Sequence, residues 1–229
     1  MMTKGNPAIM ADGSTETTEA QPKKIKVTAV GDSGVGKTCL LMTYATNKFP
    51  EGDVPELYEH MTIKAGNSNS FEVPVTVDVD DQQFKLGLTD TVGLDEYRRM
   101  RELFTVGTNV FMVCFSVTDP LSLQSVKKKW LTEIRILSPK ASFILVGTKT
   151  DLREDQSTLE ELQNKNERAI SMLDGIKTAK EVGAKTYVEC SAVNTIGMKE
   201  VFETVVKVAT NTLITPSNGK KPNSPCSIS

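Results

Sequence analysis

The 229-residue sequence predicts an α/β fold, in which a mostly parallel sheet of six strands has helices on both faces. Residues 110–116 and 143–147 are nearly continuous apolar runs, which is typical of parallel strands covered on both sides. The alternating runs 71–79 and 83–88 flank Asp80-Asp81 and predict an antiparallel hairpin. Segments with helical periodicity separate the other strands, as expected for strands joined by helical crossovers.

A glycine-rich segment follows the strand-like run 25–30 and leads into the helical run 39–45. It extends from Gly31 to Thr38 and reads Gly-Asp-Ser-Gly-Val-Gly-Lys-Thr. Glycines let successive N–H groups turn toward an anion at a helix N-terminus, so this spacing predicts a phosphate-binding loop. The alternative, a turn that binds nothing, is disfavoured by the strand and helix on either side. We expect phosphate contacts from Ser33, Gly34, Val35, Gly36, Lys37, Thr38 and Cys39.

An aspartate follows the second strand of the predicted hairpin. Asp90 begins Asp-Thr-Val-Gly and comes at the carboxyl end of a strand that faces the phosphate loop. In this place it would hold Mg²⁺ through water, with the hydroxyl of Thr38 as a direct ligand. An aspartate that only caps the next helix is the alternative, which the loop upstream makes the weaker one.

A further carboxylate, Asp151, closes the run Thr148-Lys149-Thr150-Asp151 after the strand 143–147. It can accept hydrogen bonds from N1–H and the 2-amino group of guanine, which adenine does not offer in that arrangement. The sequence therefore predicts binding of GTP and GDP. The alternative, a P-loop ATPase or kinase, is disfavoured by this Thr-Lys-x-Asp pattern.

Composition and cysteine usage indicate which ligands and which compartment are expected for this protein. The net charge of −2 gives no reason to expect nucleic-acid binding, and no apolar run is long enough to cross a bilayer. No secretory signal is expected at the N-terminus, and the four cysteines lack metal-type spacing, which favours a reducing cytoplasmic compartment. Residues 1–22 are predicted to be a disordered extension, 23–214 the folded domain and 215–229 a flexible tail.

The last four residues, Cys226-Ser227-Ile228-Ser229, fit a prenylation pattern loosely, because Ser227 is not aliphatic. A tail with a stray cysteine is the alternative. We expect a lipid on Cys226 and, since one chain anchors weakly, reversible attachment to the cytoplasmic face of membranes.

Together these motifs resemble the Rho/Rac family of Ras-like small GTPases over about residues 24–213. The matching segments are Gly-Lys-Thr-Cys-Leu-Leu at 36–41, Asp-Thr-x-Gly at 90–93, Val-Gly-Thr-Lys-x-Asp at 146–151 and Glu-Cys-Ser-Ala at 189–192. A charged segment opening with Leu-Arg-Glu-Asp at 152–155 resembles the insert helix of that family, over about 153–170.

The resemblance implies a P-loop NTPase G domain that hydrolyses GTP as a switch in signal transduction, in actin or membrane processes. It implies that Phe49 flanks the guanine, that Lys149 packs along it and that Ser191 and Ala192 contact it, Ala192 through its backbone N–H. Effector proteins, exchange factors and dissociation inhibitors are the implied partners.

Departures from the family pattern concern hydrolysis. Leu94 stands where the family has a glutamine that orients the attacking water, next to Gly93, and leucine cannot hydrogen-bond to water. Val92 replaces an alanine and Ser33 a glycine. We therefore expect slow hydrolysis, with Lys37 stabilising phosphate charge. A binding module that holds nucleotide and is controlled by abundance, lipidation or partners is the second reading.

The first switch is ambiguous in register. The threonine that binds Mg²⁺ in the family aligns with Glu56, although Thr62 could supply it from a displaced loop. Both remain candidate metal ligands.

Overall fold

A computed structural model of the chain describes residues 23–52 and 73–213. Within these ranges lies one six-stranded sheet, with the order β2-β3-β1-β4-β5-β6. Its strands are β1 (Lys23–Val30), β2 (Val73–Val79), β3 (Gln82–Thr89), β4 (Val110–Ser116), β5 (Ser142–Thr148) and β6 (Tyr187–Glu189). Only the β2–β3 pair is antiparallel. The predicted fold class and hairpin are confirmed.

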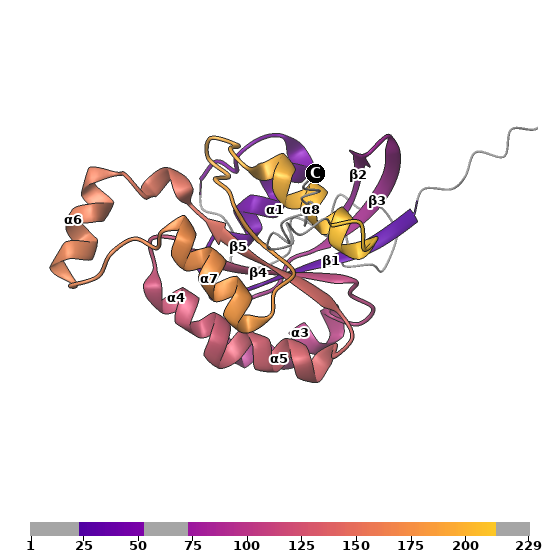
Figure 1. The fold of residues 1–229 in the computed structure, drawn as a ribbon, viewed down its shortest axis with the longest axis horizontal. Coiled ribbons are helices and arrows are strands. Elements are labelled where there is room, and N and C mark those ends of the chain that lie inside the picture. The colour runs from indigo at the N-terminus through magenta and orange to yellow at the C-terminus, as the bar shows by residue number, and fades with distance from the viewer. Residues whose placement is uncertain (1–22, 53–72, 214–229) are drawn as a thin grey trace, which may run out of the picture.

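Helices cover both faces of this sheet (Figure 1). The α-helices are α1 (Lys37–Thr46), α3 (Arg98–Phe104), α4 (Pro120–Ser125), α5 (Leu131–Leu137), α6 (Gln156–Asn164), α7 (Met172–Val182) and α8 (Met198–Ala209). The short turns are η1 (Asp95–Tyr97), η2 (Val126–Trp130) and η3 (Thr150–Leu152). In Figure 1, α1 and α8 lie on one side of the sheet, and α3, α4, α5 and α7 on the other.

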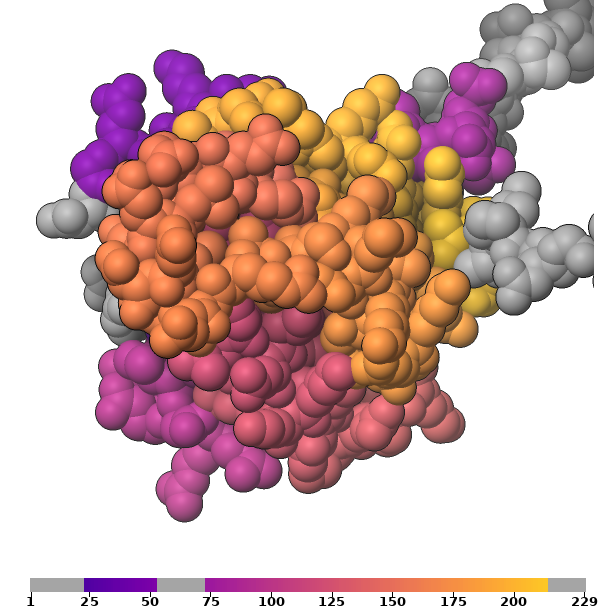
Figure 2. All heavy atoms as spheres, turned by 60° about the vertical axis from the view of Figure 1, so that its left-hand side comes forward, coloured from indigo at the N-terminus to yellow at the C-terminus, as the bar shows by residue number. Residues whose placement is uncertain are grey.

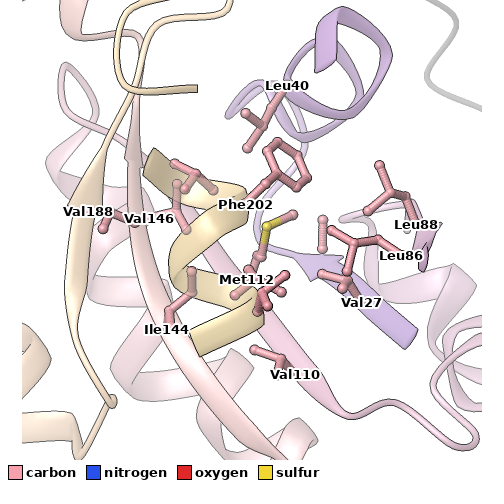
Figure 3. Packing of buried hydrophobic residues seen from close by; sticks show 14 of the residues in the cluster. Val27, Leu40, Leu86, Leu88, Val110, Met112, Ile144, Val146, Val188 and Phe202 are labelled. Atoms are coloured by element: carbon pink, nitrogen blue, oxygen red, sulfur yellow. The ribbon is translucent and has the colours of Figure 1, made fainter. Parts of the chain in front are cut away.

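Two apolar clusters hold the layers together, one on each face of the sheet. On the α1–α8 side, Phe202 packs against Leu40 and Met112 (Figure 3) and stacks on Tyr44 with ring centroids 3.5 Å apart. Full burial of such a side chain contributes about 1.5–3 kcal/mol. Helix α8 buries one apolar face, formed by Met198, Val201, Phe202, Val205, Val206 and Val208.

The helical segment 120–137 contains a π-helical turn. Asp119 caps its start by accepting from the N–H groups of Leu121 and Ser122, and α4 then continues through η2 into α5. Such a turn inserts one extra residue and re-aims the side chains around it. Trp130 lies at the end of this turn and is fully buried.

The charged insert forms a shorter helix than the predicted 153–170. Helix α6 covers only Gln156–Asn164, because Asp155 caps its start by accepting from the N–H of Thr158. Beyond its end, Asn166 adopts a left-handed φ of 54°, and a right-handed helix cannot continue through this conformation. Figure 2 shows this part of the chain, in orange, on the molecular surface between α8 in yellow and the α4–α5 region in rose.

The carboxyl ends of the mutually parallel strands define one edge of the sheet. Val30, Thr89, Thr148 and Glu189 end β1, β3, β5 and β6 there, and open α/β sheets bind ligands at such edges. No helix within the described ranges is long and apolar enough to cross a membrane. The predicted extension 1–22, the tail 215–229, Glu56, Thr62 and Cys226 lie outside the described residues.

Candidate functional site

The loop between β1 and α1 has the geometry of an anion-binding turn. Gly34 and Gly36 adopt left-handed φ angles of 74° and 96°, which side chains other than glycine seldom tolerate. Gly36 is also the N-cap of α1, and no side chain caps this helix start. Since the first N–H groups of a helix lack intrahelical partners, these donors and the helix dipole face the end of the loop.

A cleft in two lobes opens beside this loop. The larger lobe, of about 400 Å³, is lined by Ser33, Gly34, Gly36, Lys37, Thr38, Cys39, Phe49, Thr91, Val92, Gly93 and Lys149. The smaller, of about 230 Å³, is mostly apolar and is lined by Gly36, Cys39, Leu40, Phe49, Thr148, Lys149, Asp151, Leu152, Cys190, Ala192 and Val193. Gly36, Cys39, Phe49 and Lys149 line both lobes. The pair suits a phosphate chain joined to a flat base.

Lys37 is anchored within the loop. Its Nζ donates to the carbonyl oxygens of Gly31 at 2.9 Å and Asp32 at 2.8 Å, and the residue is 5% exposed. Burial lowers the pKa of Lys37, and the nearby carboxylate of Asp90 opposes that shift. The ammonium group is thus held at the floor of the larger lobe, where an anion would stabilise its charge.

Thr38 and Asp90 form the predicted pair beside it. The Thr38 hydroxyl donates to Oδ2 of Asp90 at 2.5 Å, and the N–H of Thr91 donates to Oδ1 at 2.9 Å. Burial raises the pKa of Asp90, while Lys37 and these hydrogen bonds oppose the rise.

This pair fits Mg²⁺, which takes one or two protein ligands and completes its shell with water and phosphate oxygens. No cluster of three or more acidic, His or Cys side chains suited to a metal occurs among residues 23–52 and 73–213. Nucleotide oxygens and water would therefore have to complete the coordination.

Gly93 closes the larger lobe by direct backbone contact with the phosphate loop. A Cβ at this position would lie 2.3 Å from the backbone nitrogen of Ser33, so only glycine fits. Leu94, the next residue, does not line the cleft, and its side chain points partly into solvent with 38% exposure. The structure thus places Gly93 in the site and the Leu94 side chain outside it.

Thr148, which lines the smaller lobe, is hydrogen-bonded to the phosphate loop. Its hydroxyl lies 2.5 Å from the carbonyl oxygen of Val35 and 2.9 Å from that of Phe115. Lys149 adopts a left-handed φ of 60°, and Asp151 follows in η3. Asp151 and Ala192, for which a contact with the base is predicted, both line the smaller lobe.

Two predicted contacts do not reach the cleft with their side chains. Val35 is buried with 1% exposure, and the Ser191 hydroxyl is buried and accepts from the N–H of Asn194. Neither residue lines either lobe, so a contact with nucleotide would have to use backbone groups.

A hydrogen-bond network that the sequence did not predict joins the segment after η3 to strand β6. Arg153, which follows η3, donates to both carboxylate oxygens of Glu189 at 2.8 and 2.6 Å, and the Tyr187 hydroxyl donates to the same carboxylate at 2.6 Å. The hydrogen bond to Glu189 raises the pKa of Arg153. Glu189 and Arg153 stood in the quoted motifs, but nothing local in the sequence indicated that they pair.

A parallel sheet with a glycine-rich loop, a lysine and a threonine at the start of α1 defines a P-loop nucleotide-binding protein. A family model described as the Ras family matches residues 26–211, and the chain belongs to that family. It is thus a small GTPase, a class that binds GTP and GDP, typically with Mg²⁺, hydrolyses GTP and works with regulatory or effector proteins.

Proposed function

We propose that this chain is a Rho-like switch with slow intrinsic GTP hydrolysis, acting in signal transduction. Leu94 is the main support for slow hydrolysis, because its side chain offers no hydrogen bond and does not line the cleft. A water beside the terminal phosphate would lack the side chain that usually orients it. The Rho-like assignment is supported by the motif Leu-Arg-Glu-Asp at 152–155, followed by helix α6.

The remaining groups are suited to phosphate transfer. Lys37 would stabilise charge on the phosphate oxygens, and the free N–H groups at the start of α1 would hold the chain of phosphates. Thr38 and Asp90 would hold Mg²⁺, which supplies charge neutralisation when bound. In this proposal, binding is intact and only the positioning of water is impaired.

The same proposal includes the membrane. A prenyl group on Cys226, with only Lys220 and Lys221 as nearby basic residues, would give weak and reversible attachment at the cytoplasmic face. Actin or membrane processes, with effectors, exchange factors and dissociation inhibitors, are the proposed setting. The test is partition between a detergent phase and an aqueous phase. After incubation with a prenyltransferase and farnesyl diphosphate, the chain should move into the detergent phase, and Cys226→Ser should abolish that shift.

A second candidate is a GTP-binding module that does not turn over and is regulated by abundance, lipidation or partners. The exposed apolar Leu94 also favours this function. Protein preloaded with GTP and Mg²⁺ separates the two when bound nucleotide is followed over hours. Slow conversion to bound GDP supports the switch, whereas GTP retained unchanged supports the module. Failure to retain either nucleotide, or equal competition by ATP, would contradict both.

A further inference from the structure

The smaller lobe of the cleft lies between two loops that are far apart in the sequence. Asp151 in η3 and Ala192 beyond the end of β6 both line this lobe. A backbone hydrogen bond joins the two loops, from the N–H of Thr150 to the carbonyl oxygen of Cys190, and at 3.3 Å it is longer than usual. The separation of Asp151 and Ala192 therefore depends also on side-chain contacts behind the lobe.

Arg153 makes these contacts. It ends η3, two residues after Asp151, and its N–H donates to the carbonyl oxygen of Thr150 at 3.2 Å. Its bidentate pair with Glu189, the last residue of β6, involves side chains that are only 25% and 13% exposed, so solvent screens the pair weakly. A planar guanidinium bound through two parallel hydrogen bonds has a fixed orientation, which sets the distance between η3 and β6.

Glu189 is held from its other side by Tyr187. The Tyr187 hydroxyl donates to Oε1 of Glu189 at 2.6 Å, and burial, together with this hydrogen bond, raises the pKa of Tyr187, so the hydroxyl remains a donor. The ring abuts Gly147 of β5 and Gly175 of α7, where a Cβ at either position would collide with it. Tyr187 therefore has little room to move, and the carboxylate that receives Arg153 is fixed.

The remaining acceptor of Arg153 is anchored in the sheet. Arg153 Nε donates to the carbonyl oxygen of Ile170 at 3.1 Å. The N–H of Ile170 donates to Val117 O at 2.7 Å, and the N–H of Val117 donates to Thr148 O at 3.1 Å. Thr148 ends β5 and lines the smaller lobe. Arg153 is thus held between the ends of β5 and β6, the two strands from which the base-side loops emerge.

We propose that Arg153 is a positioning residue that keeps Asp151 and Ala192 at the separation a guanine base requires, and thereby slows release of the bound nucleotide. Arg153 lines neither lobe and acts through Glu189. This inference rests on the guanine-nucleotide binding of the proposed switch. Its consequence is selective: without Arg153 the base contacts should weaken, while the phosphate contacts in the larger lobe should not.

The test compares Arg153→Met with the matched control Arg168→Met. Methionine keeps an apolar stem but donates no hydrogen bond from its side chain. Arg168 is 77% exposed on its side chain, pairs with Asp174 at 3.1 Å and lines neither lobe. Since both substitutions remove the same charge, a difference between them reports where the arginine lies in the fold.

A double variant, Arg153→Met with Glu189→Gln, separates loss of positioning from loss of folding. The single variant leaves the Glu189 carboxylate without its cation, which destabilises a poorly exposed charge. In the double variant no such charge remains, and Tyr187 can still donate to the amide oxygen of glutamine. Far-UV circular dichroism and urea unfolding with bound GDP check that each variant is folded.

Release of GDP and of inosine diphosphate (IDP), whose base lacks the 2-amino group, is measured with Mg²⁺ after addition of excess competitor. We expect Arg153→Met and the double variant to release GDP about tenfold faster and IDP only about threefold faster, because GDP loses two contacts with Asp151 and IDP one. Arg153→Lys keeps a charged donor without the paired geometry and should give intermediate rates. Arg168→Met should change neither rate.

Equal acceleration of GDP and IDP release, or unchanged rates for both, would overturn the positioning role while leaving the switch standing. A normal GDP rate in the double variant would trace the effect of Arg153→Met to the unpaired carboxylate and would overturn it as well. If the unchanged protein bound no guanine nucleotide, the proposed function and this inference would both fall.

Discussion

The indole Nε1 of Trp130 donates a 2.8 Å hydrogen bond to the Asp32 carboxylate, which belongs to the phosphate loop. Trp130 is a fully buried core residue and at the same time a direct contact of the predicted site. A side chain that packs the interior on this face of the sheet is therefore hydrogen-bonded directly to the phosphate loop.

Trp130 should report nucleotide binding by fluorescence. It is the only tryptophan in the sequence, and a phosphate group near Asp32 would change the electrostatic field at the indole. We expect GDP with Mg²⁺ to change its emission saturably, at the same concentration as in a filter-binding assay, and ATP to have no effect. Constant emission while GDP is shown to bind would contradict this coupling.

Asp151→Asn should weaken binding of GDP and GTP. The carboxylate lines the smaller lobe, and each hydrogen bond to a charged group contributes about 1.5–3 kcal/mol, so we expect at least about a tenfold loss. The amide can donate to the 2-oxo group of xanthine, and xanthosine diphosphate should therefore compete better than with the unchanged protein. Equal affinities for GDP and xanthosine diphosphate in both proteins would show that Asp151 does not read the base.

Cys39 should be the thiol that nucleotide protects from alkylation among the described cysteines. It lines both lobes and is half-buried, whereas Cys114 and Cys190 are almost fully buried. Burial raises the pKa of Cys190 to about 12 and raises that of Cys114 well above its ordinary value, so both remain protonated at pH 8.5 or so.

Burial also raises the pKa of Cys39, so its labelling should accelerate as the pH increases. Peptide mass spectrometry after iodoacetamide treatment measures each site separately. GDP should slow labelling of the Cys39 peptide, and identical rates with and without GDP would place the nucleotide elsewhere.

Glu189→Gln should destabilise the fold by about 1–3 kcal/mol in urea unfolding. It removes the charge that Arg153 and Tyr187 share, in a pair whose side chains are only 25% and 13% exposed. The matched control is Glu181→Gln, which loses the open Lys127–Glu181 pair with exposures near one half and should cost less than about 1 kcal/mol. Equal effects of the two substitutions would contradict a special role for the buried pair.

Local chemistry made much of the site predictable. Two of its patterns, the glycine spacing before Lys37 and Thr38 and the carboxylates at strand ends such as Asp90 and Asp151, form within a few adjacent residues. The Trp130–Asp32 and Lys129–Gly93 contacts do not, because they join segments 98 and 36 positions apart and depend on a π turn. The end of α6 was also missed, since the left-handed turn at Asn166 leaves no signature in the charge pattern.

The slow hydrolysis proposed for this chain can be measured in a single turnover. Protein preloaded with GTP and Mg²⁺ is compared with its Leu94→Gln variant, at equal nucleotide occupancy. We expect a very slow rate for the unchanged chain and an increase of about a hundredfold when glutamine can orient the water. Brisk hydrolysis with Leu94 in place, or no gain in Leu94→Gln although GTP binds tightly, would contradict it.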